Sequence, residues 1–129
     1  MRDILTINKL LLLSLLLLLS SNLYAKNSKK TEIGIASWYG KAFHGRITAN
    51  GETYNMYEYT AAHPTLPFNA IVEVTNLQNN RKIKVRINDR GPYAKRRIID
   101  LSYLAAKKLG YLHRGITKVK IKVLYRQKR

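Results

Sequence analysis

The chain begins with a long apolar segment and continues with short stretches in which apolar and polar residues alternate. Residues 10–19 are leucine except for Ser14, whereas residues 82–87 and 119–123 alternate strictly between apolar and basic side chains. Strict alternation is typical of a strand that buries one face. The pattern therefore predicts an apolar leader followed by a mainly β domain.

Further alternating or apolar stretches, bounded by proline, glycine and polar turns, predict the individual elements. Ser102 is a good N-cap for a short helix that Gly110 ends, and a polar turn over 76–81 is expected to join two strands as a hairpin. Many short strands with one helix predict a small closed barrel, which has no exposed edges. The expected strands are 33–39, 59–62, 71–75, 82–87 and 119–123, and the expected helix is 103–109.

The N-terminal segment has the order of a secretory signal peptide. Arg2 and Lys9 give a basic start, the leucine run follows, and small and polar residues precede Lys26. This order predicts cleavage after Ala25. The leucine run is shorter than the roughly 20 residues that a membrane-spanning helix needs. An uncleaved membrane anchor is therefore the less favoured alternative, and no stable membrane span is expected after cleavage.

The rest of the chain has the length of one small domain with polar ends. We assign residues 1–25 to the signal peptide, 26–32 to a polar linker, 33–125 to the barrel and 126–129 to a basic tail. The sequence has no cysteine, so the domain is expected to fold on its core alone, without disulfides. We therefore expect an exported protein, periplasmic or associated with the cell wall, that is not a lipoprotein.

The formal net charge is +17, and a field of that sign favours polyanionic partners. An exported protein seldom meets nucleic acid, so we expect no nucleic-acid partner. Anionic cell-wall polymer fits the predicted compartment better. A solvated basic surface without a partner is the alternative for most of this charge.

Four titratable residues stand in loops or at strand ends among glycines and a proline: Glu52, His63, Asp89 and Asp100. Carboxylates and imidazole are the groups that general acid–base catalysis uses. Each has a structural alternative. Glu52 is then a solvated loop acid, His63 a histidine hydrogen-bonded to backbone, Asp89 a turn-closing residue paired with Arg90, and Asp100 a carboxylate stabilising the start of a helix.

Five short motifs follow one another across most of the chain, from about residue 34 to residue 123. Their order resembles the RlpA (rare lipoprotein A) family and, more broadly, the double-psi β-barrel domains of expansins. The resemblance implies an all-β, six-stranded double-psi β-barrel with one or two short helices. The motifs are Ala36-Ser37-Trp38-Tyr39-Gly40, Thr48-Ala49-Asn50-Gly51-Glu52, Thr60-Ala61-Ala62-His63, Asn88-Asp89-Arg90-Gly91-Pro92-Tyr93 and Ile99-Asp100-Leu101-Ser102.

The same resemblance implies septal, endolytic lytic transglycosylase activity on peptidoglycan. It ties Glu52, His63 and Asp89 to activity, and Asp89 is the predicted general acid–base. Asp100 matches an aspartate in the functional groove of expansins and is the alternative acid. Many family members carry a lipid-modified cysteine and a C-terminal domain that binds peptide-stripped glycan. This sequence shows neither feature, so septal recruitment and a preference for stripped strands are not predicted.

Aromatic and basic residues near these motifs are candidates for substrate binding. Trp38 and Tyr39 are candidates for stacking on sugar rings, although an aromatic pair that ends a strand is more often part of the core. Arg46, Arg86 and Arg90 are candidates for binding carboxylates of the peptide stems, with solvated charge as the alternative. The three histidines form no spaced ligand set, so no metal and no other cofactor is expected.

The predicted function is cleavage of the bond between N-acetylmuramic acid and N-acetylglucosamine by a monomer, leaving 1,6-anhydro ends on peptidoglycan glycan strands. The alternative is a non-catalytic, expansin-like module that binds cell-wall glycan. Glu52 and His63 favour the enzyme, because a binding module has less need of them beside the aspartates.

Overall fold

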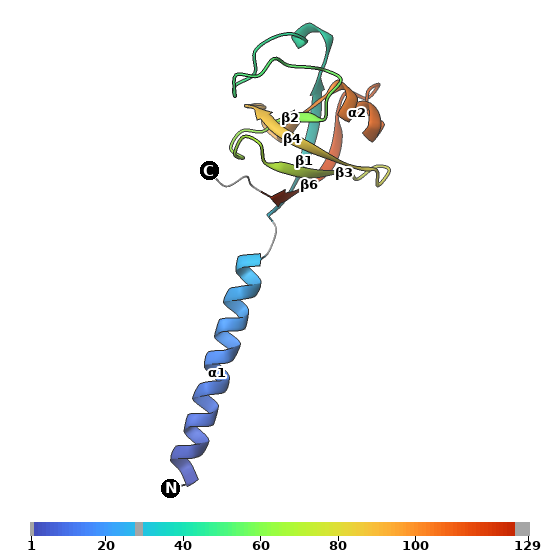
Figure 1. Ribbon diagram of the computed structural model, residues 1–129. Helices are drawn as coiled ribbons and strands as arrows, with labels where there is room; N and C mark the ends of the chain where they lie inside the picture. Colours follow the sequence, from blue (N-terminus) through green and yellow to red (C-terminus); the bar gives the residue numbers. More distant parts are fainter. Residues whose placement is uncertain (1, 28–29, 126–129) are drawn as a thin grey trace.

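Six strands, two α-helices and one 3₁₀ helix make up the described part of the chain (Figure 1). The computed structural model describes residues 2–27 and 30–125. The strands close into a barrel in the order β1-β5-β2-β4-β3-β6. The predicted six-stranded, mainly β fold is therefore confirmed. The elements are α1 (Arg2–Asn27), β1 (Thr31–Tyr39), η1 (Lys41–Phe43), β2 (Thr60–Ala62), β3 (Ile71–Asn76), β4 (Lys82–Asp89), β5 (Arg97–Ser102), α2 (Tyr103–Leu109) and β6 (Thr117–Tyr125).

The N-terminal helix α1 points away from the barrel (Figure 1). Residues 3–20 are exposed, and the segment Asp3–Ser20 is long and apolar enough to cross a membrane. A signal sequence passes the same test, so the helix is consistent with the predicted leader. Cleavage after Ala25 stays a prediction.

Two of the strand pairs in the barrel are parallel, β1 with β5 and β2 with β4. Each joins segments that lie far apart in the sequence. The other pairs are antiparallel, including the predicted hairpin of β3 and β4. Its turn is closed by a hydrogen bond from the Asn76 amide to the Arg81 carbonyl, at 2.9 Å. Closure of the barrel places β4 and β5, which carry Asp89 and Asp100, on either side of β2.

Two elements differ from the pattern-based prediction. The alternation pattern does not predict β5, which begins in a charged segment. This strand forms because β1 and β2 pair with it on both sides. β1 begins at Thr31, since Thr31 and Glu32 pair with Lys122 and Ile121 of β6. These two residues therefore belong to the barrel rather than to the linker, while the predicted basic tail 126–129 lies outside the described residues.

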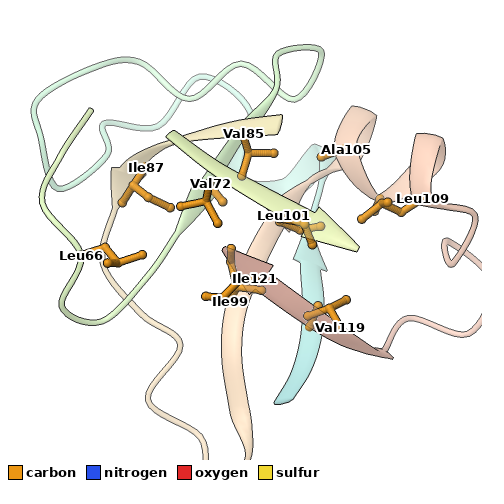
Figure 2. Packing of buried hydrophobic residues seen from close by; sticks show 14 of the residues in the cluster. Leu66, Val72, Val85, Ile87, Ile99, Leu101, Ala105, Leu109, Val119 and Ile121 are labelled. Carbon is orange, nitrogen blue, oxygen red and sulfur yellow. The ribbon is translucent and has the colours of Figure 1, made fainter. Parts of the chain in front are cut away.

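Aliphatic side chains fill the barrel interior (Figure 2). Along β4 and β6 these buried residues alternate with more exposed ones. The helix α2 packs beside the interior side chains through its buried residues Ala105, Ala106 and Leu109. Its predicted cap is confirmed, because the Ser102 hydroxyl accepts a hydrogen bond from the Ala105 amide and Gly110 ends the helix at φ 80°. Only glycine adopts that left-handed conformation readily.

Ile121→Ala should lower the free energy of unfolding by about 2–5 kcal/mol, because the packed interior collapses only partly around the lost side chain. Ile33→Ala is the matched control. Ile33 is 58% exposed, so its truncation should cost at most about 1 kcal/mol of strand preference. Urea unfolding followed by circular dichroism measures both variants, and equal losses would contradict the assignment of Ile121 to the core.

Candidate active site

Two aspartates from different strands flank the same residue of β2. Ala62 pairs with Asp100 of β5 on one side and with Asp89 of β4 on the other. Directly paired residues point to the same face of a sheet, and the preceding residue, Ala61, belongs to the core. Asp89 and Asp100 therefore share the outer face of the barrel, with α-carbons about 10 Å apart from the strand spacing.

Asp89 ends β4 and is oriented by backbone amides. Its Oδ1 accepts hydrogen bonds from the amides of Ala49 and Arg90, both at 2.9 Å. Its Oδ2 makes no hydrogen bond with the described residues. The two amides therefore fix the direction of the carboxylate through one of its oxygens.

Asp100 lies in the middle of β5 and accepts a hydrogen bond from the Ser37 hydroxyl of β1. The helix-cap alternative for Asp100 is not what the structure has, since Ser102 caps α2. Asp100 instead faces outward beside Ala62, across one strand from Asp89. The fold thus brings both candidate acids to one place.

The Tyr39 hydroxyl is buried close to both aspartates. Burial raises the pKa of Tyr39 well above its ordinary value, and the carboxylates of Asp89 and Asp100 raise it further. The Tyr39 ring packs on the Tyr54 ring, with centroids 4.4 Å apart. The Tyr39 ring is therefore packed against Tyr54 and Phe43, and a role for it in sugar binding stays a prediction.

Glu52 forms a bidentate ion pair with Arg86 of β4. The guanidinium Nη1 and Nη2 donate to Oε1 and Oε2 of Glu52 at 2.6 and 2.8 Å. The Asn50 and Asn88 side-chain amides donate to the same carboxylate, at 2.8 and 3.4 Å. Chiefly because of the Arg86 hydrogen bonds, the pKa of Glu52 falls from 4.5 to about 2. These hydrogen bonds therefore favour the ionised form of Glu52.

The Glu52–Arg86 pair fastens the segment 48–52 onto β4. Within that segment, Glu52 is linked to Thr48 through its backbone carbonyl, which accepts from the Thr48 amide at 2.7 Å. The next amide along, that of Ala49, is the one that holds Asp89. The ion pair therefore positions a donor to the candidate acid.

His63 is 4% exposed, and both ring nitrogens have partners. Nδ1 accepts from the amides of Thr65 and Leu66, at 3.1 and 3.0 Å, and Nε2 lies 3.2 Å from Glu32 Oε2. Burial lowers the pKa of His63, with Glu32 acting against it. A neutral ring that accepts at Nδ1 carries its proton on Nε2. This geometry matches the structural alternative for His63.

Arg90 and Arg46 also have protein partners. The Arg90 guanidinium donates to the carbonyls of Leu66 and His63, at 2.8 and 3.3 Å, and lies 3.9 Å from the centre of the Phe68 ring. Arg90 therefore ties together the chain after β2, and it contacts Asp89 through its backbone amide. Arg46 is exposed, with its guanidinium 5.5 Å from the centre of the Phe43 ring.

Trp38 is half-buried against the core, with its ring 5.9 Å from that of Tyr103. Gly40 leaves room for the same ring, because a β-carbon there would lie 2.6 Å from Trp38 Cζ3. Trp38 is thus mainly a packing residue. Among the described residues, no group of three or more His, Cys, Asp and Glu is placed to hold a metal ion, and the absence of a metal stays a prediction.

Sequence reasoning missed the partnership of Arg86 with Glu52 and treated Arg86 as a candidate for binding substrate. The alternation of β4 places Arg86 on the outer face, which was a usable signal. Its partner lies 34 residues away, and nothing local to the sequence indicates that pairing.

A family model described as "Lytic transglycolase" matches residues 31–121. The endolytic peptidoglycan transglycosylase RlpA of Pseudomonas aeruginosa (strain UCBPP-PA14) is 58% identical over 89 residues, which are 69% of this chain and 26% of the relative. The protein of that name from Vibrio cholerae is 56% identical over 100 residues, 77% of this chain and 38% of the relative. The chain therefore spans less than half the length of these curated relatives.

Two solved structures share the barrel. The Streptomyces papain inhibitor superposes with a TM-score of 0.61 at 27% identity, covering 74% of this chain and 96% of the inhibitor. An expansin from Clavibacter michiganensis gives a TM-score of 0.60 at 16% identity, covering 78% of this chain and 53% of the expansin. The expansin likeness shows the fold alone, and it confirms the predicted double-psi β-barrel.

The Glu52–Arg86 pair predicts a pH dependence. Because the pKa of Glu52 is lowered on folding, the pair stabilises the folded state above about pH 4.5, and this contribution is lost as the pH falls toward about 2. Carbon-detected NMR of the Glu52 carboxyl should show it still ionised at about pH 3. Arg86→Gln should move the midpoint back toward 4.5, whereas Arg97→Gln should not. A midpoint indifferent to Arg86 would contradict this account.

Proposed function

This chain belongs to the lytic transglycosylase family with the double-psi β-barrel fold, and we propose that it cleaves the glycan strands of peptidoglycan. The bond cut is that between N-acetylmuramic acid and N-acetylglucosamine, and the product carries a 1,6-anhydro end. The observation that carries the proposal is the placement of Asp89 and Asp100 on either side of Ala62 in a member of this family.

The reaction needs one group that gives a proton and then takes one back. A carboxylic acid protonates the glycosidic oxygen as the bond from C1 of the muramic residue breaks. The 6-hydroxyl of the same residue then attacks C1, and the carboxylate takes the hydroxyl proton. No water is consumed, so a single carboxyl can serve both steps.

Asp89 is the proposed general acid–base. The Ala49 and Arg90 amides fix its Oδ1, and its Oδ2 has no partner among the described residues. A carboxyl held in this way presents one oxygen in a defined direction, as a positioned proton donor must. Asp100 lies one strand further along the same face and places a second carboxyl near the reacting bond.

Glu52 and His63 support the site without transferring protons. Glu52 is ionised, and both of its oxygens are occupied by Arg86, Asn50 and Asn88. His63 is buried and holds the turn after β2. Substitution of either residue impairs turnover by moving the segments around Asp89.

The place of action that fits this function is the periplasm or the cell wall. The apolar helix α1 acts as the export signal, and the mature barrel then meets peptidoglycan as a monomer. The net charge of +17 attracts the carboxylates of peptide stems, an attraction that salt screens.

Asp89→Asn should lower the turnover number by about 10²- to 10⁴-fold, because it removes the transferable proton and keeps the shape of the side chain. Release of 1,6-anhydro muropeptides from purified sacculi, followed by mass spectrometry, measures the rate. Binding to sacculi and the unfolding midpoint should be unchanged. Glu73→Gln on β3 is the control, because it removes a carboxylate away from the site and should keep full activity. Asn76→Asp does not serve as a control, since Asn76 is buried.

Asp100→Asn should give a smaller loss than Asp89→Asn. A fully active Asp89→Asn beside an inactive Asp100→Asn would transfer the acid role to Asp100. If the unmodified protein binds sacculi and releases no anhydro product, the enzyme proposal fails and a non-catalytic glycan-binding module is the better account.

A further inference from the structure

Tyr57 is a large aromatic side chain that is 62% exposed on the segment between η1 and β2. Its ring meets two neighbours edge-on. The centroids of the His44 and Tyr103 rings lie 5.8 and 6.1 Å away, at interplanar angles of 69° and 86°. These contacts steady the ring while leaving most of its surface uncovered.

Three hydrogen bonds hold the backbone at Met56 and Tyr57. The Tyr57 amide donates to Asn55 Oδ1 at 2.9 Å, and the Met56 amide donates to His44 Nδ1 at 3.1 Å. The first turn of α2 is tied to the same segment, because the Leu104 amide donates to the Met56 carbonyl at 3.0 Å. An exposed aromatic ring on an anchored segment loses little conformational freedom when a ligand covers it.

Aromatic contacts connect Tyr57 to the two aspartates. His44 touches both Tyr57 and Tyr54, with 6.5 Å between the His44 and Tyr54 centroids. Tyr54 in turn packs on Tyr39, whose hydroxyl lies within the field of Asp89 and Asp100. These contacts pass through the buried Tyr54 ring and pack the Tyr57 segment against the aromatic cluster that adjoins the two aspartates.

We propose that Tyr57 is the stacking platform of a sugar subsite beside the cleavage site, and that it takes a pyranose ring of the glycan strand. The assignment rests on the proposed function for the identity of the glycan. It gives Tyr57 the role that the sequence suggested for Trp38 and Tyr39, whose rings are packed against other side chains. Phe43 is also exposed, but the Arg46 guanidinium lies over its ring.

The chemistry favours a sugar ring as the occupant. The axial C–H groups of a pyranose make an apolar face, which suits the face of an aromatic ring, while its hydroxyls stay at the rim. A tyrosine supplies contact area together with a polar tip at low entropic cost. The anionic groups of a wall glycan also meet a chain of net charge +17.

The test separates binding from cleavage by using the Asp89→Asn background. A hexamer of β-1,4-linked N-acetylglucosamine is titrated into the protein, and the fluorescence of Trp38, the chain's single tryptophan, reports occupancy through Tyr103. Tyr57→Ala should weaken binding roughly 3- to 10-fold, the scale of one aromatic contact. Tyr57→Phe should retain the affinity, because the ring face is kept.

Tyr125→Ala is the matched control. Tyr125 is similarly exposed, at 57%, and lies at the end of β6 that extends past the start of β1, away from Tyr39. Its loss should leave the affinity unchanged. With active protein and sacculi, Tyr57→Ala should raise KM by a similar factor and leave kcat within about twofold, as expected for binding that is equal in the ground and transition states.

Equal affinities for the unmodified protein and Tyr57→Ala, or an equal loss in Tyr125→Ala, would overturn the subsite while leaving cleavage intact. Binding that depends on Tyr57 in a protein that releases no anhydro product would uphold the subsite and reject the proposed activity. Absence of hexamer binding by the Asp89→Asn protein would overturn the subsite.

Discussion

The site depends on one short strand that is paired on both sides. β2 has three residues, Thr60–Ala62, and it joins β5 and β4 within the closed barrel. Ala61 faces the core and Ala62 faces outward, so the aspartates that pair with Ala62 must face outward with it. The backbone hydrogen bonds that close the barrel are thereby also the bonds that set the two carboxylates side by side.

The ion pair of Glu52 and Arg86 has a positional rather than an energetic importance. Its side chains are 38% and 31% exposed, and an exposed pair of this kind contributes only about 0–1 kcal/mol to stability. Its value lies in geometry. Two parallel hydrogen bonds to a planar guanidinium fix direction as well as distance, so the segment carrying the Ala49 amide is held where Asp89 needs it.

Local patterns predicted the elements that local contacts form, and missed those that depend on distant partners. The β3–β4 hairpin and the capped helix α2 follow from alternation, a polar turn and the Ser102 and Gly110 signals. β5 has no such pattern and exists because β1 and β2 pair with it. A closed barrel is held by contacts of this long-range kind.

The candidate site likewise has features that the sequence predicted and features that depend on distant contacts. The motifs identified Glu52, Asp89 and Asp100, and the fold places the two aspartates on either side of Ala62, with Glu52 on the segment whose Ala49 amide holds Asp89. The motifs did not reveal that Glu52 forms a bidentate ion pair with Arg86. Nor did they reveal that both ring nitrogens of His63 already have partners, Glu32 at one and two backbone amides at the other. A lone tyrosine in a polar segment gives no sequence signal either, and Tyr57 stands out only once its exposure and its aromatic neighbours are known.

We propose a glycosidic cleavage at Asp89 and Asp100 in which the sugar's own hydroxyl, and not water, attacks C1. Product analysis in ¹⁸O-labelled water tests it most directly. Purified sacculi are incubated with the unmodified protein, and the released fragments are examined by mass spectrometry. The account predicts 1,6-anhydro ends without ¹⁸O. Reducing ends that carry ¹⁸O at C1, or no released fragments at all, would contradict it.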